Sequence, residues 1–136
     1  MDEQNQPVVF IAGGIGIAPF YGIIEEQARL EWSRSVTLFQ VEKTPKDAAF
    51  MEKLRALTNK NFTYIPTMTR LEDSDTSWDG ERGRITADLI QKNVQDLCAP
   101  MYYIVGLPGM VDSVVEELAK IGVPQEKIKT ELFTGY

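Results

Sequence analysis

The residues from Val8 to Phe20 constrain the fold of this chain more than any other stretch. Five apolar residues, 8–12, run into a glycine cluster, which is typical of a strand buried on both faces of a parallel sheet. Pro19 suits the first turn of a helix, because its missing N–H would have no partner there. A helix that begins directly after a strand presents free N–H groups and a positive partial charge. The stretch therefore predicts a phosphate site.

The glycines of this stretch narrow the choice of ligand. Gly13, Gly14 and Gly16 let the backbone turn sharply and approach a ligand closely. The third glycine of the dinucleotide fingerprint is missing, because Pro19 stands in its place, so a tight turn without a ligand is an alternative. Residues 17–19 do not supply the Gly-Lys-Ser or Gly-Lys-Thr of a P-loop. A phospho-accepting receiver domain is disfavoured as well, because apolar residues and glycine stand where it needs acids.

The composition limits the chemistry. A length of 136 residues predicts one domain, and a net charge of −6 without a basic cluster predicts no nucleic-acid partner. No apolar run is long enough to span a membrane, so no membrane partner is expected. Cys98 is the single cysteine, which favours a cytoplasmic location. Histidine is absent, so the chemistry must rest on binding, carboxylates or a cofactor, and no metal site is expected.

Strand-like and helix-like segments alternate along the chain. After the first strand, further strands are predicted at 35–41, 62–68, 101–105 and 128–133. Thr44 and Pro45 are predicted to start a helix that continues to Leu57, and residues 69–83 are read as a surface loop carrying Trp78. This alternation predicts an α/β fold: a Rossmann-like three-layer sandwich with a five-stranded parallel sheet in the order 3-2-1-4-5. Residues 1–6 are read as a linker or chain end.

A second glycine-proline turn supports a ligand site. Residues 106–110 follow the fourth predicted strand and open a helix, as residues 13–19 do after the first. In parallel sheets, ligands bind beyond the carboxyl ends of the strands where the strand order reverses. If the first and fourth strands are neighbours, both turns line one crevice. The pair of turns is therefore a stronger signal than either turn alone.

With both turns placed, residues 7–136 resemble the NAD(P)-binding domain of the ferredoxin–NADP reductase superfamily. Residues 13–19 resemble its Gly-Gly-x-Gly-x-Thr-Pro motif, and residues 106–110 resemble its Gly-Pro-Pro-x-Met turn. Residues 69–70 fall where members carry Ser-Arg or Thr-Arg, residues 83–86 also fit, and 131–136 resemble a Glu-x-Phe-x-Gly-Tyr ending. Ala18 replaces a usual Thr or Ser and Val105 a usual cysteine, departures that concern hydride transfer more than binding.

The resemblance implies that the domain binds NAD(P)H and positions the nicotinamide for hydride transfer to a flavin. The flavin-binding motif is absent here, so FAD is expected on a separate domain, with electrons passed to an acceptor protein such as ferredoxin or an oxygenase component. The alternative is a stand-alone nucleotide-binding or sensing module without redox activity. Arg70 falls where the 2′-phosphate of NADPH is gripped, although Glu42 would repel that phosphate if it pointed inward.

The resemblance also assigns site residues. Glu131 and Phe133 are the implied catalytic positions, at the mouth that faces the flavin. The implied cofactor-binding residues are Gly13, Gly14, Ile15, Gly16, Ile17, Ala18, Pro19, Thr69, Arg70, Arg84, Gly106, Leu107, Pro108 and Met110.

Overall fold

The computed structural model describes residues 6–72 and 77–132. Within these residues, no helix has the length and apolar character needed to cross a membrane. The elements in chain order are β1 (Val8–Gly13), the 3-10 turn η1 (Gly14–Gly16), α1 (Ile17–Arg29), β2 (Val36–Glu42), η2 (Pro45–Asp47), α2 (Met51–Ala56), β3 (Phe62–Met68), β4 (Glu81–Arg82), α3 (Ala87–Asn93), β5 (Met101–Gly106), α4 (Pro108–Lys120), η3 (Gln125–Lys127) and β6 (Ile128–Leu132).

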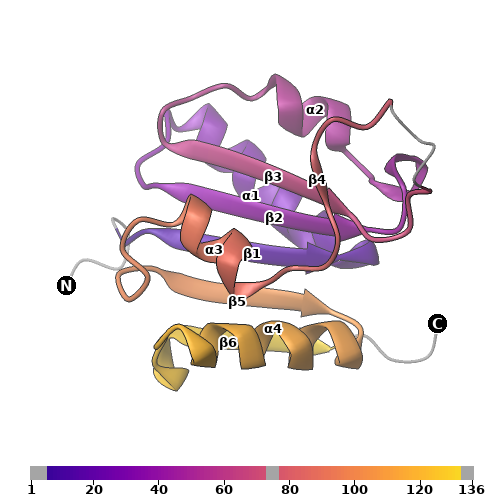
Figure 1. Cartoon of the computed structure of the whole chain (residues 1–136). Helices are drawn as coiled ribbons and strands as arrows, with labels where there is room; N and C mark the ends of the chain where they lie inside the picture. The colour runs from indigo at the N-terminus through magenta and orange to yellow at the C-terminus, as the bar shows by residue number, and fades with distance from the viewer. Residues whose placement is uncertain (1–5, 73–76, 133–136) are drawn as a thin grey trace.

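The strands form one parallel sheet in the order β4-β3-β2-β1-β5-β6 (Figure 1). The five predicted strands lie in the predicted order, but the predicted number of strands is wrong, because β4 adds a sixth at the edge. β4 pairs Glu81 with Thr67 and Arg82 with Met68 and no more. Two polar residues carry no alternating apolar pattern, so hydrophobic periodicity could not reveal this strand.

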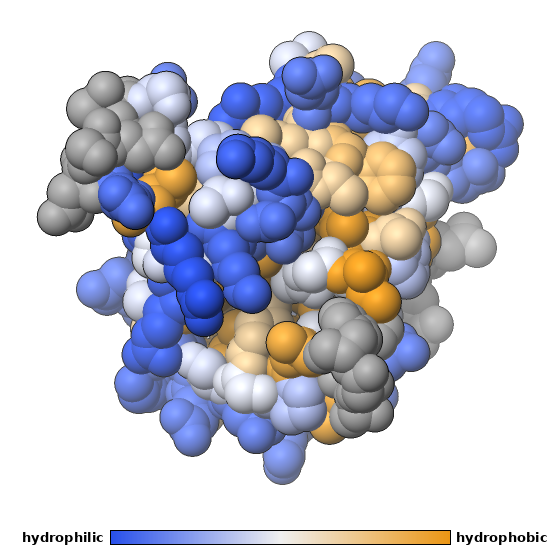
Figure 2. All heavy atoms as spheres, turned by 90° about the vertical axis from the view of Figure 1, so that its right-hand side faces the viewer, coloured by the Kyte–Doolittle hydropathy of each residue, from blue (hydrophilic) through white to orange (hydrophobic). Residues whose placement is uncertain are grey.

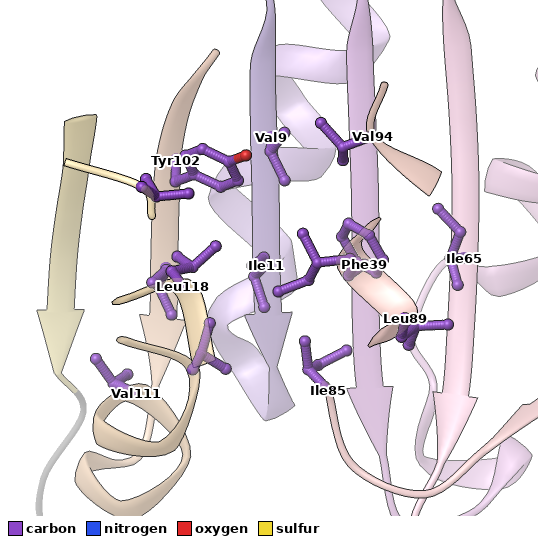
Figure 3. Packing of buried hydrophobic residues seen from close by; sticks show 14 residues of the cluster. Val9, Ile11, Phe39, Ile65, Ile85, Leu89, Val94, Tyr102, Val111 and Leu118 are labelled. Atoms are coloured by element: carbon purple, nitrogen blue, oxygen red, sulfur yellow. The ribbon is translucent and has the colours of Figure 1, made fainter. Parts of the chain in front are cut away.

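Helices cover both faces of the sheet, as predicted for a three-layer sandwich. Alternate residues of each strand point to opposite faces. On β1, Val9 and Ile11 join a core beneath α3 and α4, and Figure 3 shows both packed among Phe39, Tyr102 and Leu118. On the other face, α1 and α2 cover a second core, whose buried members include Val8, Phe10, Ala12, Ile17, Phe20, Ile24, Leu38, Leu54 and Val105.

The prediction of a surface loop around Trp78 is wrong for that residue. Trp78 is buried, and its indole N–H donates a 2.8 Å hydrogen bond to the Glu81 carbonyl. The Arg55 guanidinium lies 5.0 Å from the centre of the ring, within cation–π range. The chain therefore folds back at Trp78 and delivers residues 81–82 to the edge of β3. The polar sequence around the tryptophan hides this tertiary contact.

The predicted continuous helix over residues 44–57 is also wrong. A 3-10 turn ends at Asp47, and α2 begins at Met51 after Phe50, which has φ +65°. The side-chain amide of buried Gln40 donates to the Ala49 carbonyl over 3.2 Å. A continuous helix would use that carbonyl internally. The contact with Gln40 therefore replaces one turn of helix at this point.

Candidate functional site

The strand order reverses between β1 and β5, which is where the ligand crevice was expected. The two strands are neighbours, with Ala12 opposite Val105. β1 is followed by η1 and α1, and β5 by α4, so two helices begin at the same edge of the sheet. Figure 2 looks onto this edge and shows hydrophilic surface dominating its left side, with hydrophobic surface gathered to the right of centre.

A cavity of about 770 Å³ lies at this edge. The predicted residues that line it come from both glycine-containing turns and from the segment after β3. They are Gly13, Gly14, Ile15, Thr69, Arg84, Leu107 and Met110. The structure thus brings together three stretches that lie far apart in the sequence.

The remaining predicted residues do not line this cavity. Gly16 and Ile17 are buried, and Ala18, Pro19 and Pro108 are exposed near the starts of α1 and α4. Arg70 is exposed and follows Thr69, and its backbone N–H donates to the Lys43 carbonyl over 2.9 Å. Glu131 is exposed on β6 opposite Val105, and Phe133 lies outside the described residues.

Two predicted glycines have specific reasons to be glycine: Gly14 in the cavity wall, and Gly106, which is buried at the end of β5 and does not line the cavity. Gly14 has φ +60°, a left-handed conformation that side chains disfavour. A Cβ on Gly106 would lie 2.8 Å from Met110 Sδ, which is too close, whereas one on Gly13 would lie 3.4 Å from Val41 Cγ1, an ordinary contact distance. Backbone conformation therefore favours glycine at position 14, and packing favours it at position 106.

Glu42, at the end of β2, lies in the cavity wall, although only 7% of its surface is exposed. Its Oε1 accepts the Gly14 N–H over 3.2 Å, and its Oε2 accepts the Gln40 side-chain amide over 3.1 Å. Burial raises the pKa of Glu42 to about 7; the nearby Asp47 carboxylate also raises it, while the two hydrogen bonds lower it. The sequence identified Glu42 as a possible source of repulsion, not as a partner of the glycine loop.

Several further residues of the wall were missed. Lys43 and Asp47 follow β2 and contribute charge, and Ser113 on α4 accepts a 2.7 Å hydrogen bond from the Arg84 guanidinium. A usable signal existed for the first two, because β2 ends at the same edge as β1. The rest of the wall consists of Val41, Ala49, Ile85, Gly109 and Val114. Across residues 6–72 and 77–132, no group of three or more His, Cys, Asp or Glu side chains could hold a metal ion.

Comparison with known families identifies the domain. The model of the oxidoreductase NAD-binding domain family matches residues 10–116, most of the chain. The chain belongs to this family. The resemblance to the NAD(P)-binding domain of the ferredoxin–NADP reductase superfamily is thereby confirmed, and membership of the family supports NAD(P)H as the cofactor.

Relatives of this NAD-binding domain are longer proteins. It is 30% identical over 98% of its length to the xylene/toluene monooxygenase electron transfer component XylA of Pseudomonas putida, and 29% identical over 95% to the reductase component of propane 2-monooxygenase of Rhodococcus jostii. It spans 38% and 36% of those two proteins. The solved structure of a ferredoxin reductase in carbazole 1,9a-dioxygenase matches with a TM-score of 0.77 and 27% identity, over 98% of this chain and 40% of that one.

Proposed function

We propose that this chain is the NAD(P)H-binding part of a flavin-dependent oxidoreductase, and that it positions the nicotinamide for hydride transfer to a flavin held by a separate domain. Electrons then pass to an acceptor protein, such as ferredoxin or an oxygenase component. The observation that carries this proposal is the cavity at the strand-order reversal, walled by Gly13, Gly14 and Met110. The names of the relatives support the electron-transfer role, since they are reductase or electron-transfer components of oxygenases.

The wall of the cavity has the features that a dinucleotide needs. Backbone at Gly14 approaches without a Cβ, and the start of α1 supplies positive partial charge for the pyrophosphate. Arg84 and Lys43 add positive charge from two other segments, and the planar fork of arginine suits phosphate oxygens. NAD(P)H, when bound, supplies a hydride from its nicotinamide ring. The residues of the chain bind and orient it.

Exposed apolar residues around the cavity offer a surface for the flavin domain. Ile15, Leu107 and Leu132 are 58%, 46% and 49% exposed, and they end or follow β1, β5 and β6 at the same edge of the sheet. Isolated exposed residues of this size are common, but three at one edge beside a cofactor cavity favour a docking face. Glu131 precedes Leu132, so we place it at the rim of this face. Its catalytic role remains a prediction.

Titration calorimetry with NADH and NADPH tests the binding function. We expect binding of at least one of them with one site per chain and no requirement for flavin. We also expect no reduction of ferricyanide by NAD(P)H with this chain alone, since the flavin is held elsewhere. Reduction should appear when a flavin-loaded partner domain is added. Protein that binds neither nucleotide would refute the proposal, and binding without reduction in the presence of the partner domain would favour a binding or sensing module.

A further inference from the structure

The glycine loop already holds an anion of its own. Glu42 extends from the end of β2, and its carboxylate accepts the N–H of Gly14, the first residue of η1. This N–H lies beside the start of the 13-residue helix α1, where the positive partial charge of the helix is concentrated. The proposed function places the phosphates of the dinucleotide at this same loop. The carboxylate and the phosphates therefore compete for one region of positive charge.

A charged Glu42 carboxylate would repel the phosphates of a bound nucleotide. Glu42 is buried, so water screens its charge poorly, and a pyrophosphate carries two negative charges. A protonated Glu42 removes the repulsion, and its O–H can then donate to a phosphate oxygen, which a carboxylate cannot do. The proton comes from solvent, and no other bond changes.

We propose that Glu42 gates the glycine loop, so that nucleotide binding takes up a proton at this carboxyl group. The proposal rests on the proposed function, because it requires nucleotide phosphates at residues 13–19.

Other charged groups around Glu42 affect how strongly proton uptake is coupled to nucleotide binding. Asp47 lines the same cavity and repels a charged Glu42, whereas Lys43 and Arg84 line it as cations that favour both the carboxylate and the phosphates. From β3, the Tyr64 hydroxyl donates to Gln40, which in turn donates to Glu42. The glycine loop and α1 contribute backbone N–H groups on this side. Gln40 is fully buried, so the polar chain that positions the carboxylate is fixed by packing.

The direction of the pH dependence follows from the environment. The pKa of Glu42 is raised to about 7 in the free protein, mainly by burial, and added phosphate charge raises it further in the complex. Below pH 7 the acid is already protonated, so binding costs no proton. Above pH 7 each complex must take up a proton, and the affinity falls by up to tenfold per pH unit. We expect the dissociation constant at pH 8 to be about tenfold larger than at pH 6.

The experiment measures NADH and NADPH dissociation constants by calorimetry from pH 6 to pH 8.5, for the wild-type chain, Glu42→Gln and Glu52→Gln. Glutamine keeps an acceptor for the Gly14 N–H without a charge. Glu42→Gln should change less than about twofold across this range and bind about tenfold more tightly than wild type at pH 8. Glu52→Gln removes an exposed charge from α2 outside the cavity wall, and it should keep the wild-type slope.

Proton uptake tests the same gate without a variant. Titrations of the wild-type chain at pH 8 in Tris and in HEPES buffers, whose ionisation enthalpies differ, should reveal close to one proton bound per nucleotide. No uptake, or an equal pH slope in wild type and Glu42→Gln, would overturn the gate. Weaker binding by Glu42→Gln at pH 8 would also overturn it, and would make Glu42 an acceptor for a ribose hydroxyl. Absence of binding by wild type even at pH 6 would overturn the proposed function, and the gate with it.

Discussion

The Arg84 guanidinium donates a 2.7 Å hydrogen bond to the Ser113 hydroxyl, which joins the segment before α3 to α4 beside the cavity. Both side chains line the cavity, and Arg84 is also exposed to solvent. An arginine on a solvated segment has many rotamers, and a fixed partner reduces the entropy lost when it meets a phosphate. We therefore expect Ser113 to hold Arg84 in place for contact with a phosphate.

Substitution of this pair should give graded losses of affinity. Arg84→Ala removes a charge-assisted bond worth about 1.5–3 kcal/mol, a loss of tenfold or more in nucleotide affinity. Ser113→Ala leaves the charge but frees the guanidinium, and a loss of about 1 kcal/mol, roughly fivefold, is expected. Calorimetry measures both values. Arg29→Ala is the matched control, because Arg29 ends α1 at the opposite edge of the sheet. Equal affinity in Arg84→Ala and wild type would place Arg84 outside the site.

Gly106→Ala should disturb the cavity wall through Met110. The added Cβ would lie 2.8 Å from Met110 Sδ, so the methionine must move, although its flexibility limits the cost to about 1 kcal/mol of folding stability. Nucleotide affinity should fall severalfold, because the displaced side chain enters the cavity. Gly22→Ala is the control for affinity, since a Cβ there meets nothing within 4 Å and Gly22 lies on α1 outside the cavity wall. Adding Met110→Ala to Gly106→Ala should recover affinity. A Gly106→Ala variant that matches wild type in both measurements would contradict the argument.

Arg70→Ala tests the choice between the two nucleotides. Arg70 is exposed directly after Thr69, and Thr69 lines the cavity. We expect the variant to lose more affinity for NADPH than for NADH, by tenfold or more, because a bond from arginine to the 2′-phosphate contributes about 1.5–3 kcal/mol. Dissociation constants for both nucleotides, in wild type and variant, give the answer. Equal losses would instead assign Arg70 to the pyrophosphate or ribose that both nucleotides share.

Alanine substitutions at two exposed glycines test the effect of backbone conformation on stability without any change in packing. A Cβ would meet nothing within 4 Å at either Gly22, in the middle of α1, or Gly122, after α4. Gly22→Ala should stabilise the fold by about 0.5–1 kcal/mol, because alanine favours a helix. Gly122 has φ +85°, so Gly122→Ala should destabilise by about 1 kcal/mol. Urea unfolding measures both changes. If both substitutions changed the free energy of unfolding in the same direction, backbone conformation would not explain their effects.

Local patterns were sufficient where each residue acts through its own backbone or its own strand face. Thr86 caps α3 through a residue three positions away, because its hydroxyl accepts the Leu89 N–H over 3.2 Å. Gly122, with φ +85°, and Pro124 directly follow α4, which ends at Lys120, and both residue types end helices through their own backbone. The sequence also predicted that the two glycine-proline turns lie side by side, because adjacent parallel strands end at the same edge of the sheet.

Patterns failed where a distant partner decides the conformation. The break before α2 depends on Gln40 reaching the Ala49 carbonyl, and the short strand β4 depends on Trp78 turning the chain back toward β3. Gln40 lies on β2 and not on the helix, and Trp78 is held against Arg55 of α2, so neither contact leaves a periodic signal in its own segment.

The sequence by itself determined the order of the five main strands, both glycine turns and the family, because unbroken apolar runs, glycine and proline act locally and topology follows from right-handed crossovers. Tertiary structure alone decided that Glu42 faces the Gly14 N–H and that Arg84 meets Ser113. These contacts span 28 and 29 residues and depend on where the sheet places each strand end. The charge and pKa of a side chain are properties of its surroundings, and those surroundings exist only in the folded chain.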